Sequence, residues 1–140
     1  MKKLSFFLFA VLALACVALY SCGSDEPKGA LGGTWVLRNL SDKDSEGTLT
    51  FKFNGNKVSF IEKWTERGYD DDIETYEGTC VIDTEAKTVA MIITPTYYDS
   101  DDTYEWLFDY ELSGGKLTLT PANSTTRGYW GSSSRTFTRQ

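Results

Sequence analysis

The chain contains no histidine and only three cysteines, Cys16, Cys22 and Cys80. Without histidine it cannot assemble a serine–histidine–acid triad, a cysteine–histidine nucleophile pair or a zinc site of cysteine and histidine. A nucleophilic Cys80 would need a cation beside it to hold the thiolate, so we expect Cys80 to pack as a small apolar residue. These absences predict a protein that is not an enzyme, with no cofactor and no metal.

Long apolar runs are also missing. The longest, Phe6 to Tyr20, has 15 residues, which is short of the roughly 20 that a helix needs to span the hydrocarbon core of a membrane. Lys2 and Lys3 precede it and give a short basic segment. A basic start followed by a short apolar run is typical of a secretory signal peptide. We therefore expect residues 1–21 to be a signal.

The last three residues of the signal and the cysteine after it, Leu19-Tyr20-Ser21-Cys22, resemble a bacterial lipobox, which implies a lipidated Cys22 carrying acyl chains such as palmitate. Cys16, after Ala13-Leu14-Ala15, is the alternative and matches less well. Residues 22–30 are polar and acidic after the cysteine, as in a flexible tether. Acidic residues there resemble the export signal of surface lipoproteins of the Bacteroidota type, and a plain spacer is the alternative. The expected location is the cell envelope, anchored to the outer membrane.

Positive charge is scarce. Removal of Lys2 and Lys3 with the signal changes the net charge of the chain from −6 to −8. A protein with this much negative charge repels nucleic acid and anionic lipid surfaces, so we do not expect them as partners. The remaining 119 residues suffice for one domain, which we place at residues 31–140. Because Cys22 would be acylated, Cys80 has no partner for an intrachain disulfide.

Helical periodicity is absent, and apolar residues instead alternate with polar ones along short segments. Leu49, Phe51 and Phe53 alternate with threonine and lysine, and Asn54-Gly55 supplies a tight hairpin turn after them. The strongest alternation runs from Thr103 to Leu112. Strands are expected at residues 35–38, 48–53, 57–60, 74–83, 87–94, 103–112, 116–120 and 135–139.

Eight strands joined by short turns predict an all-β fold, a single antiparallel up-and-down barrel that is closed and so has no exposed edges. A sandwich of two sheets is the alternative, because periodicity alone does not separate the two. In the strand from Thr103 to Leu112 the apolar face carries Tyr104, Trp106, Phe108, Tyr110 and Leu112.

Gly33-Thr34-Trp35 resembles the Gly-x-Trp signature of lipocalins. With Thr48-Leu49-Thr50-Phe51, Tyr76-Glu77-Gly78-Thr79, Leu117-Thr118-Leu119-Thr120 and Phe137-Thr138-Arg139, the order of motifs resembles the lipocalin-like lipoproteins of the Bacteroidota type. The resemblance implies a tryptophan at the closed end of the barrel, covered by Arg139 or Arg135. The chain departs from lipocalins in its shorter length and in having no clear C-terminal helix, which argues against a large cavity.

Acidic residues form two clusters, at residues 70–72 and 99–102. Loop carboxylates of this kind suit calcium, but neither cluster matches an EF-hand, and we interpret them as solvated hairpin tips. The paired acids of a glycosidase would have to come from glutamates such as Glu62, Glu77, Glu105 and Glu111. Glu77, Glu105 and Glu111 share the polar faces of their strands, where a solvated carboxylate is expected.

Aromatic residues are more numerous than a small core requires, and several carry a polar group that suits a ligand. The candidate ligand-binding residues are Trp64, Tyr97, Tyr98, Tyr104, Trp106, Tyr129 and Trp130. They predict a non-catalytic module that binds a small apolar or glycan-like ligand. The alternative is a packed barrel whose loops, residues 66–72 and 123–134, contact another protein that the sequence does not identify.

Overall fold

The computed structural model describes residues 29–96 and 102–140, apart from the side chain of Asp42, and they form eight antiparallel strands in one closed ring. Each strand pairs with the next, and β8 returns to β1. The ring confirms the predicted up-and-down barrel and excludes the sandwich. The elements are β1 (Gly33–Asp42), β2 (Ser45–Asn54), β3 (Lys57–Glu66), β4 (Asp72–Asp83), β5 (Thr88–Pro95), β6 (Tyr104–Ser113), β7 (Lys116–Pro121), α2 (Ser124–Trp130) and β8 (Arg135–Arg139).

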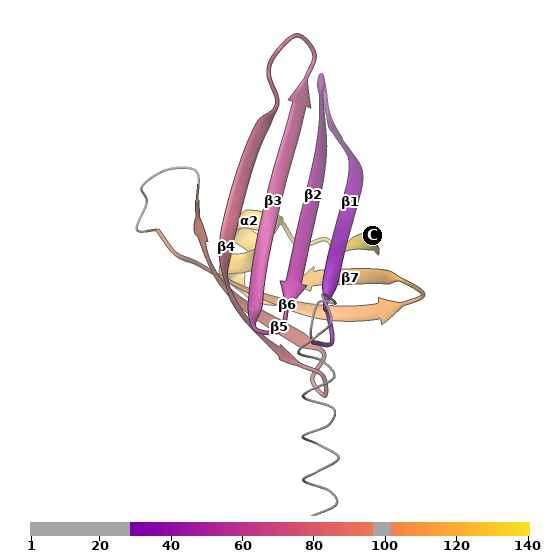
Figure 1. The fold of residues 1–140 in the computed structure, drawn as a ribbon, viewed down its shortest axis with the longest axis vertical. Helices are drawn as coiled ribbons and strands as arrows, with labels where there is room; N and C mark the ends of the chain where they lie inside the picture. Colours follow the sequence, from indigo (N-terminus) through magenta and orange to yellow (C-terminus); the bar gives the residue numbers. More distant parts are fainter. Residues whose placement is uncertain (1–28, 97–101) are drawn as a thin grey trace, which may run out of the picture.

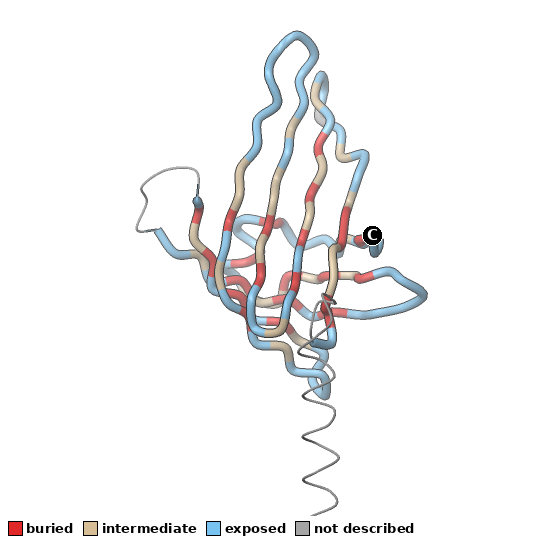
Figure 2. Tube along the Cα trace, in the orientation of Figure 1, coloured by how far each residue is buried: buried red, intermediate tan, exposed pale blue. Residues whose placement is uncertain are grey.

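The barrel has two unlike sides. Strands β1 to β4 run side by side as a tall curved sheet, and β5 to β7 cross beside their lower parts at a steep angle (Figure 1). The hairpins β1–β2 and β3–β4 therefore extend beyond the rest of the barrel, and buried residues concentrate below these extensions (Figure 2). We call the end with the extensions the mouth and the opposite end the closed end.

Aromatic rings fill the interior of the barrel. The ring of Phe51 is fully buried and has five ring neighbours with centroids 4.8–6.4 Å away. Strand alternation explains this filling, because every second residue of β2, β3 and β6 faces inward. The fully buried large side chains are Trp35, Trp106, Phe51, Phe53, Phe60, Phe108, Phe137, Leu31, Met91, Ile93, Leu117 and Leu119. The described interior is a packed core.

The closed end is sealed by Trp35 and the segment before it. Trp35 is fully buried, and its Nε1 donates to the carbonyl oxygen of Leu31 over 2.9 Å. The guanidinium of Arg139 lies 4.3 Å from the centroid of the Trp35 ring and donates to the Gly32 carbonyl over 2.9 Å. Of the two arginines considered from the sequence, Arg139 therefore covers Trp35, while Arg135 lies over Trp130. A cation above an indole face is a favourable arrangement.

A glycine permits the sharp turn of the sheet between its two sides. Gly78 of β4 pairs with Ile93 of β5, and a Cβ atom at Gly78 would collide with the carbonyl oxygen of Ile92. Only glycine allows the two backbones to approach this closely. Gly78 thus marks the place where the tall sheet bends into the lower strands.

Helix α2 corrects the expectation that no helix precedes the last strand and that residues 123–134 are a loop. Asn123 caps the helix, its Oδ1 accepting from the Thr126 amide over 2.8 Å, and Gly131 ends it with φ of 78°. The amide of Leu107 donates to Thr126 Oγ1 over 2.8 Å and ties the helix to β6. Seven residues are too few to show a helical period, and only the cap residues signal it.

Several strand details also differ from prediction, and β1 covers Gly33–Asp42 instead of residues 35–38. Strand β3 extends to Glu66 instead of ending at Phe60, because Glu62 and Trp64 continue the inward alternation with polar atoms. Leu112, expected inside, is 41 % exposed since it lies at the end of the β6–β7 hairpin, beyond the core. Within the described ranges, no helix has the length and apolar character needed to span a bilayer.

Candidate functional site at the mouth

Polar and aromatic side chains meet where the tall sheet rises above the packed core. Glu62 pairs with Glu74 across β3 and β4, one step beyond the pair of Phe60 with Tyr76. Inward alternation places all four on the concave face. Trp64 follows Glu62 on the same face, while Tyr104 comes from β6 and Tyr129 from α2. We call Glu62, Trp64, Glu74, Tyr76, Tyr104 and Tyr129 the mouth cluster.

Hydrogen bonds join the cluster across three elements. Trp64 Nε1 donates to Glu62 Oε1 over 2.7 Å, and the Tyr129 hydroxyl donates to Glu62 Oε2 over 2.9 Å. The Tyr76 hydroxyl donates to Glu74 Oε2 over 2.9 Å and lies 3.4 Å from that of Tyr129. Bonds to an ionised carboxylate are among the stronger ones, so the network fixes the side chains that line the mouth.

Each tyrosine hydroxyl has one proton, and in this arrangement both protons point at carboxylates. Burial raises the pKa of Tyr129, and the nearby carboxylates of Glu62 and Glu74 raise it further, whereas the neighbouring Tyr76 hydroxyl opposes the shift. A tyrosine hydroxyl is protonated at neutral pH even at its ordinary pKa, and the raised pKa keeps Tyr129 a donor to Glu62 in more alkaline solution as well. Tyr129 is 43 % exposed, so one side of the cluster is open to solvent.

Trp64 lies against the backbone of β2. It pairs with Gly47, and a Cβ atom there would lie 2.7 Å from Cζ3 of the Trp64 ring. Gly47 therefore makes room for the indole to rest on the strand, an arrangement in which an aromatic ring covers a strand glycine. With its Nε1 held by Glu62 and its side chain half-buried, Trp64 presents a fixed aromatic surface at the mouth.

The structure brings three of the seven predicted ligand-binding residues to the mouth: Trp64, Tyr104 and Tyr129. Trp106 and Trp130 are 2 % and 5 % exposed and form its floor, with ring centroids 5.2 Å apart. The position of Trp130 in α2 replaces the predicted loop position. Tyr97 and Tyr98, like the proposed lipidation site Cys22, lie outside the described residues.

Glu74 was not predicted to take part in a site, Tyr76 was not among the seven predicted ligand-binding residues, and Glu62 was considered only as one of four possible glycosidase acids. The available signal was the alternation itself, because Glu62 and Trp64 share parity with the inward Val58 and Phe60. The other three acids, Glu77, Glu105 and Glu111, are exposed as predicted.

The other described candidates have ordinary surroundings, and residues 99–101 of the second acidic cluster lie outside the described residues. Asp71 accepts a hydrogen bond from Thr65 and forms an ion pair with Lys63 at 3.1 Å, and these contacts lower its pKa. No group of three or more acidic or sulfur ligands placed to hold a metal ion occurs in the part of the chain described. Burial raises the pKa of the Cys80 thiol, which lies in the core.

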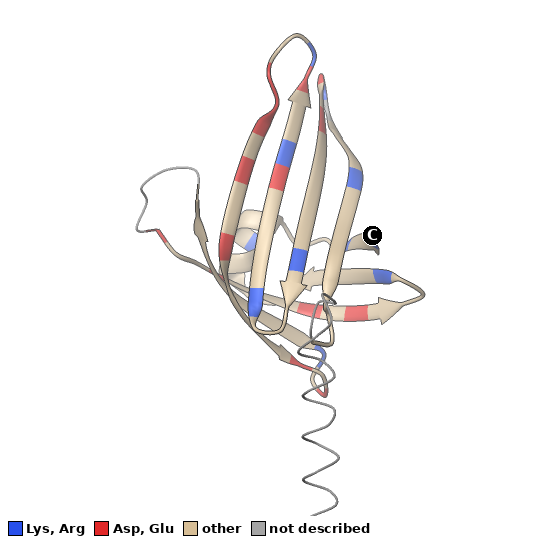
Figure 3. Ribbon diagram, in the orientation of Figure 1, with Lys and Arg blue, Asp and Glu red and all other residues tan. Residues whose placement is uncertain are grey.

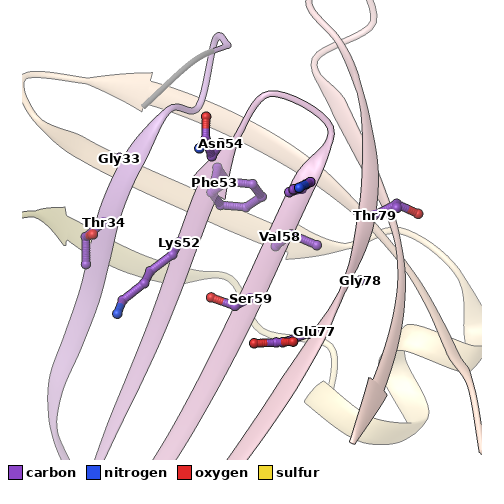
Figure 4. Close-up of a pocket in the computed structure, with 11 residues that line it drawn as sticks. Gly33, Thr34, Lys52, Phe53, Asn54, Val58, Ser59, Glu77, Gly78 and Thr79 are labelled. Carbon is purple, nitrogen blue, oxygen red and sulfur yellow. The ribbon is translucent and has the colours of Figure 1, made fainter. Parts of the chain in front are cut away.

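Two hollows lie outside the core. One, of about 640 Å³, covers the lower outer face of β1 to β4 (Figure 4). The other, of about 750 Å³, lies between the tips of the β1–β2 and β3–β4 hairpins and is lined by polar residues. The interior is packed with buried side chains, so the candidate site is the mouth cluster, which lies on the surface of this core and not inside it.

Comparison with protein-family models, with curated proteins and with solved structures finds no match to this chain.

Proposed function

We propose that the protein is a non-catalytic binding module of the cell envelope, anchored by lipid at Cys22, whose mouth cluster binds a glycan-like ligand. The signal-like residues 1–21, the lipobox-like sequence and the resemblance to lipocalin-like lipoproteins support the anchor and the class. The packed interior directs the proposal to the mouth, because ring-filled space leaves no room for a ligand inside the described barrel.

The observation that carries the proposal is the fixed Trp64 indole beside two carboxylates. A sugar ring has apolar C–H faces that pack on aromatic rings and hydroxyl edges that donate to carboxylate oxygens. Glu62 and Glu74 face each other across β3 and β4 next to Trp64, so both kinds of contact are available at one place. A wholly apolar ligand fits less well because it would remove these carboxylates from water without pairing them.

The chemistry of the chain supports binding without catalysis. The sequence has no histidine, and the Cys80 thiol is buried with a raised pKa. Both facing glutamates accept hydrogen bonds from tyrosine side chains that hold them in place. Their role in the proposal is to accept hydrogen bonds from ligand hydroxyls.

The proposal predicts binding to members of an array of neutral oligosaccharides, measured with the full-length lipoprotein and then by calorimetry on the strongest array member. Trp64→Ala removes the stacking surface and is expected to weaken binding about tenfold or more. Glu62→Gln replaces an oxygen acceptor with an amide that cannot accept from Trp64 and Tyr129 together, with a similar expected loss.

Gly47→Ala tests the position of the Trp64 ring more specifically than Trp64→Ala does. Its methyl group would lie 2.7 Å from the Trp64 ring and displace the indole without removing any polar group from the mouth. Binding should fall as in Trp64→Ala, while Glu105→Gln on the outer face of β6 and Tyr69→Ala at the β3–β4 tip bind as the parent does. Circular dichroism confirms that each variant is folded. An array without any bound member, or unchanged affinity in Trp64→Ala, contradicts the proposal.

A protein partner is the second candidate. The β3–β4 tip exposes Tyr69 at 73 % and Ile73 at 53 %, large apolar side chains of the kind found at interfaces. If a protein partner binds at this tip, crosslinking in intact cells should join the partner to the β3–β4 tip around Tyr69. The Tyr69→Ala variant should then give no crosslinked partner. Sugar binding that depends on Trp64 together with an empty crosslinking result favours the first function.

A further inference from the structure

The hollow on the outer face of β1 to β4 lies far from the mouth, and its lining combines seven polar residues with Phe53, Val58 and two glycines. Thr34, Lys52, Ser59 and Glu77 come from four successive strands and lie in one row across them (Figure 4). Lys57, at the start of β3, borders the hollow at its lower edge. The hollow has a volume of about 640 Å³, enough for a small polar group.

The row carries opposite charges at a fixed separation. Lys52 pairs with Ser59, and Ser59 pairs with Glu77, so the lysine and the glutamate stand two strand spacings apart, about 10 Å between backbones. Lys57 adds a second ammonium group. The single ion pair found in the described ranges joins Lys63 to Asp71, so no described carboxylate lies within ion-pair distance of Lys52 or Lys57. Basic residues mark the lower ends of β2 and β3 in Figure 3.

The hollow also lies beside the point where the chain joins the barrel. Gly29 lies close to Gly55 in the β2–β3 turn, because a Cβ atom added at Gly29 would lie 3.6 Å from the Cα of Gly55. Gly33, four residues further, is part of the hollow's lining. Cys22 is seven residues before Gly29, a span of at most about 25 Å of extended chain. An anchor at Cys22 would therefore hold this end of the barrel near the membrane.

We propose that the hollow binds the zwitterionic headgroup of a phospholipid in the membrane that holds the anchor, an inference that rests on the lipid anchor proposed above. Lys52 and Lys57 pair with the phosphate, and Glu77 pairs with the headgroup cation. A zwitterion suits this chain because its net charge of −8 without the signal disfavours anionic surfaces. The closed end then rests on the membrane and the mouth, at the opposite ends of the strands, faces away from it.

The test compares the rate at which an amine-acylating reagent modifies each lysine of the full lipoprotein, measured by mass spectrometry. The protein is placed either in phosphatidylcholine vesicles or in micelles of a polyoxyethylene detergent, which has no phosphate. A phosphate beside an ammonium group favours the unreactive charged form. Lys52 and Lys57 should react about fivefold more slowly in vesicles, as expected for about 80 % occupancy, and Glu77→Gln should reduce this protection while Glu105→Gln does not.

Two lysines serve as internal controls. Lys116 is the first residue of β7 at the same end of the barrel, and Lys43 lies in the β1–β2 turn at the mouth, and both should keep their rates. Equal slowing of Lys116 would show that the membrane merely covers this end, and unchanged rates at Lys52 and Lys57 in vesicle-bound protein would overturn the proposal. Protection by free phosphocholine in micelles, without protection in vesicles, would reassign the site to a soluble ligand. Protein that does not float with vesicles contradicts the anchor itself, whatever the oligosaccharide array shows.

Discussion

Phe51→Ala is expected to lower the free energy of unfolding by about 3–5 kcal/mol, the range for deleting a fully buried ring. The Phe51 side chain has no exposed surface and is surrounded by other rings, so neighbouring side chains have little freedom to fill the space it leaves. Its ring neighbours are Phe53, Phe60, Phe108, Trp130 and Phe137. Urea unfolding followed by circular dichroism measures the change.

Tyr69→Ala is the matched control, because Tyr69 is 73 % exposed and should change stability by less than about 0.5 kcal/mol. The Phe51 experiment also bears on function. A loss below about 1 kcal/mol would mean that the interior is loosely filled, and the ligand would then be sought inside the barrel instead of at its mouth.

Gly78→Ala is expected to destabilise the barrel by about 3 kcal/mol or more, because the new methyl group meets the carbonyl oxygen of Ile92, which belongs to a paired backbone. Relief requires β4 and β5 to separate at the bend that closes the barrel. Thermal unfolding and the dispersion of amide signals in an NMR spectrum report the loss.

Gly128→Ala is the opposite case within the same chain. Gly128 lies inside α2, and nothing stands within 4 Å of the position of its Cβ. Alanine is the better helix former by about 0.8–1.0 kcal/mol, so this variant should be neutral or more stable. A Gly78→Ala protein as stable as the parent would contradict the described closeness of β4 and β5.

Much of the fold was predictable because period-two alternation is strong in this sequence. Phe51 and Phe53 in β2, and Trp106, Phe108 and Tyr110 in β6, indicate their inward faces without further information. A hairpin turn after Phe53 was expected from Asn54-Gly55, but it lies one residue later than predicted. Asn54 ends β2 and pairs with Lys57, and the turn residues are Gly55, with φ of 61°, and Asn56. Closure was expected from the number of strands, and the β1–β8 contact at Trp35 and Arg139 completes it.

The parts that were not predicted depend on long-range register or on short segments. Glu62 and Glu74 are 12 residues apart in the sequence and face each other only because β3 and β4 pair in one particular register. Helix α2 is too short for a periodic pattern, so the sequence did not show that Tyr129 would meet Glu62. The inward glutamate and tryptophan of β3 also interrupt the apolar pattern, which is why β3 was predicted to end at Phe60, six residues before its observed end at Glu66.

The packed interior of this barrel supports the side chains of the mouth and holds them in place. Trp106 and Trp130 form a firm floor, and α2 is tied to β6 through Thr126. Side chains held in this way lose little freedom when a ligand arrives, which favours affinity for small polar molecules. The extended β3 and β4 then place Trp64 and the facing carboxylates above the floor, open to solvent on one side.

The most direct test of the central claim is an NMR titration of the ¹⁵N-labelled lipoprotein in phosphatidylcholine nanodiscs with the oligosaccharide that binds best on the array. The four tryptophans give four indole N–H signals. We predict that the Trp64 signal moves with saturation while that of Trp35, at the closed end, stays in place. Movement of the Trp35 signal without the Trp64 signal, or no movement of any indole signal, would contradict binding at the mouth.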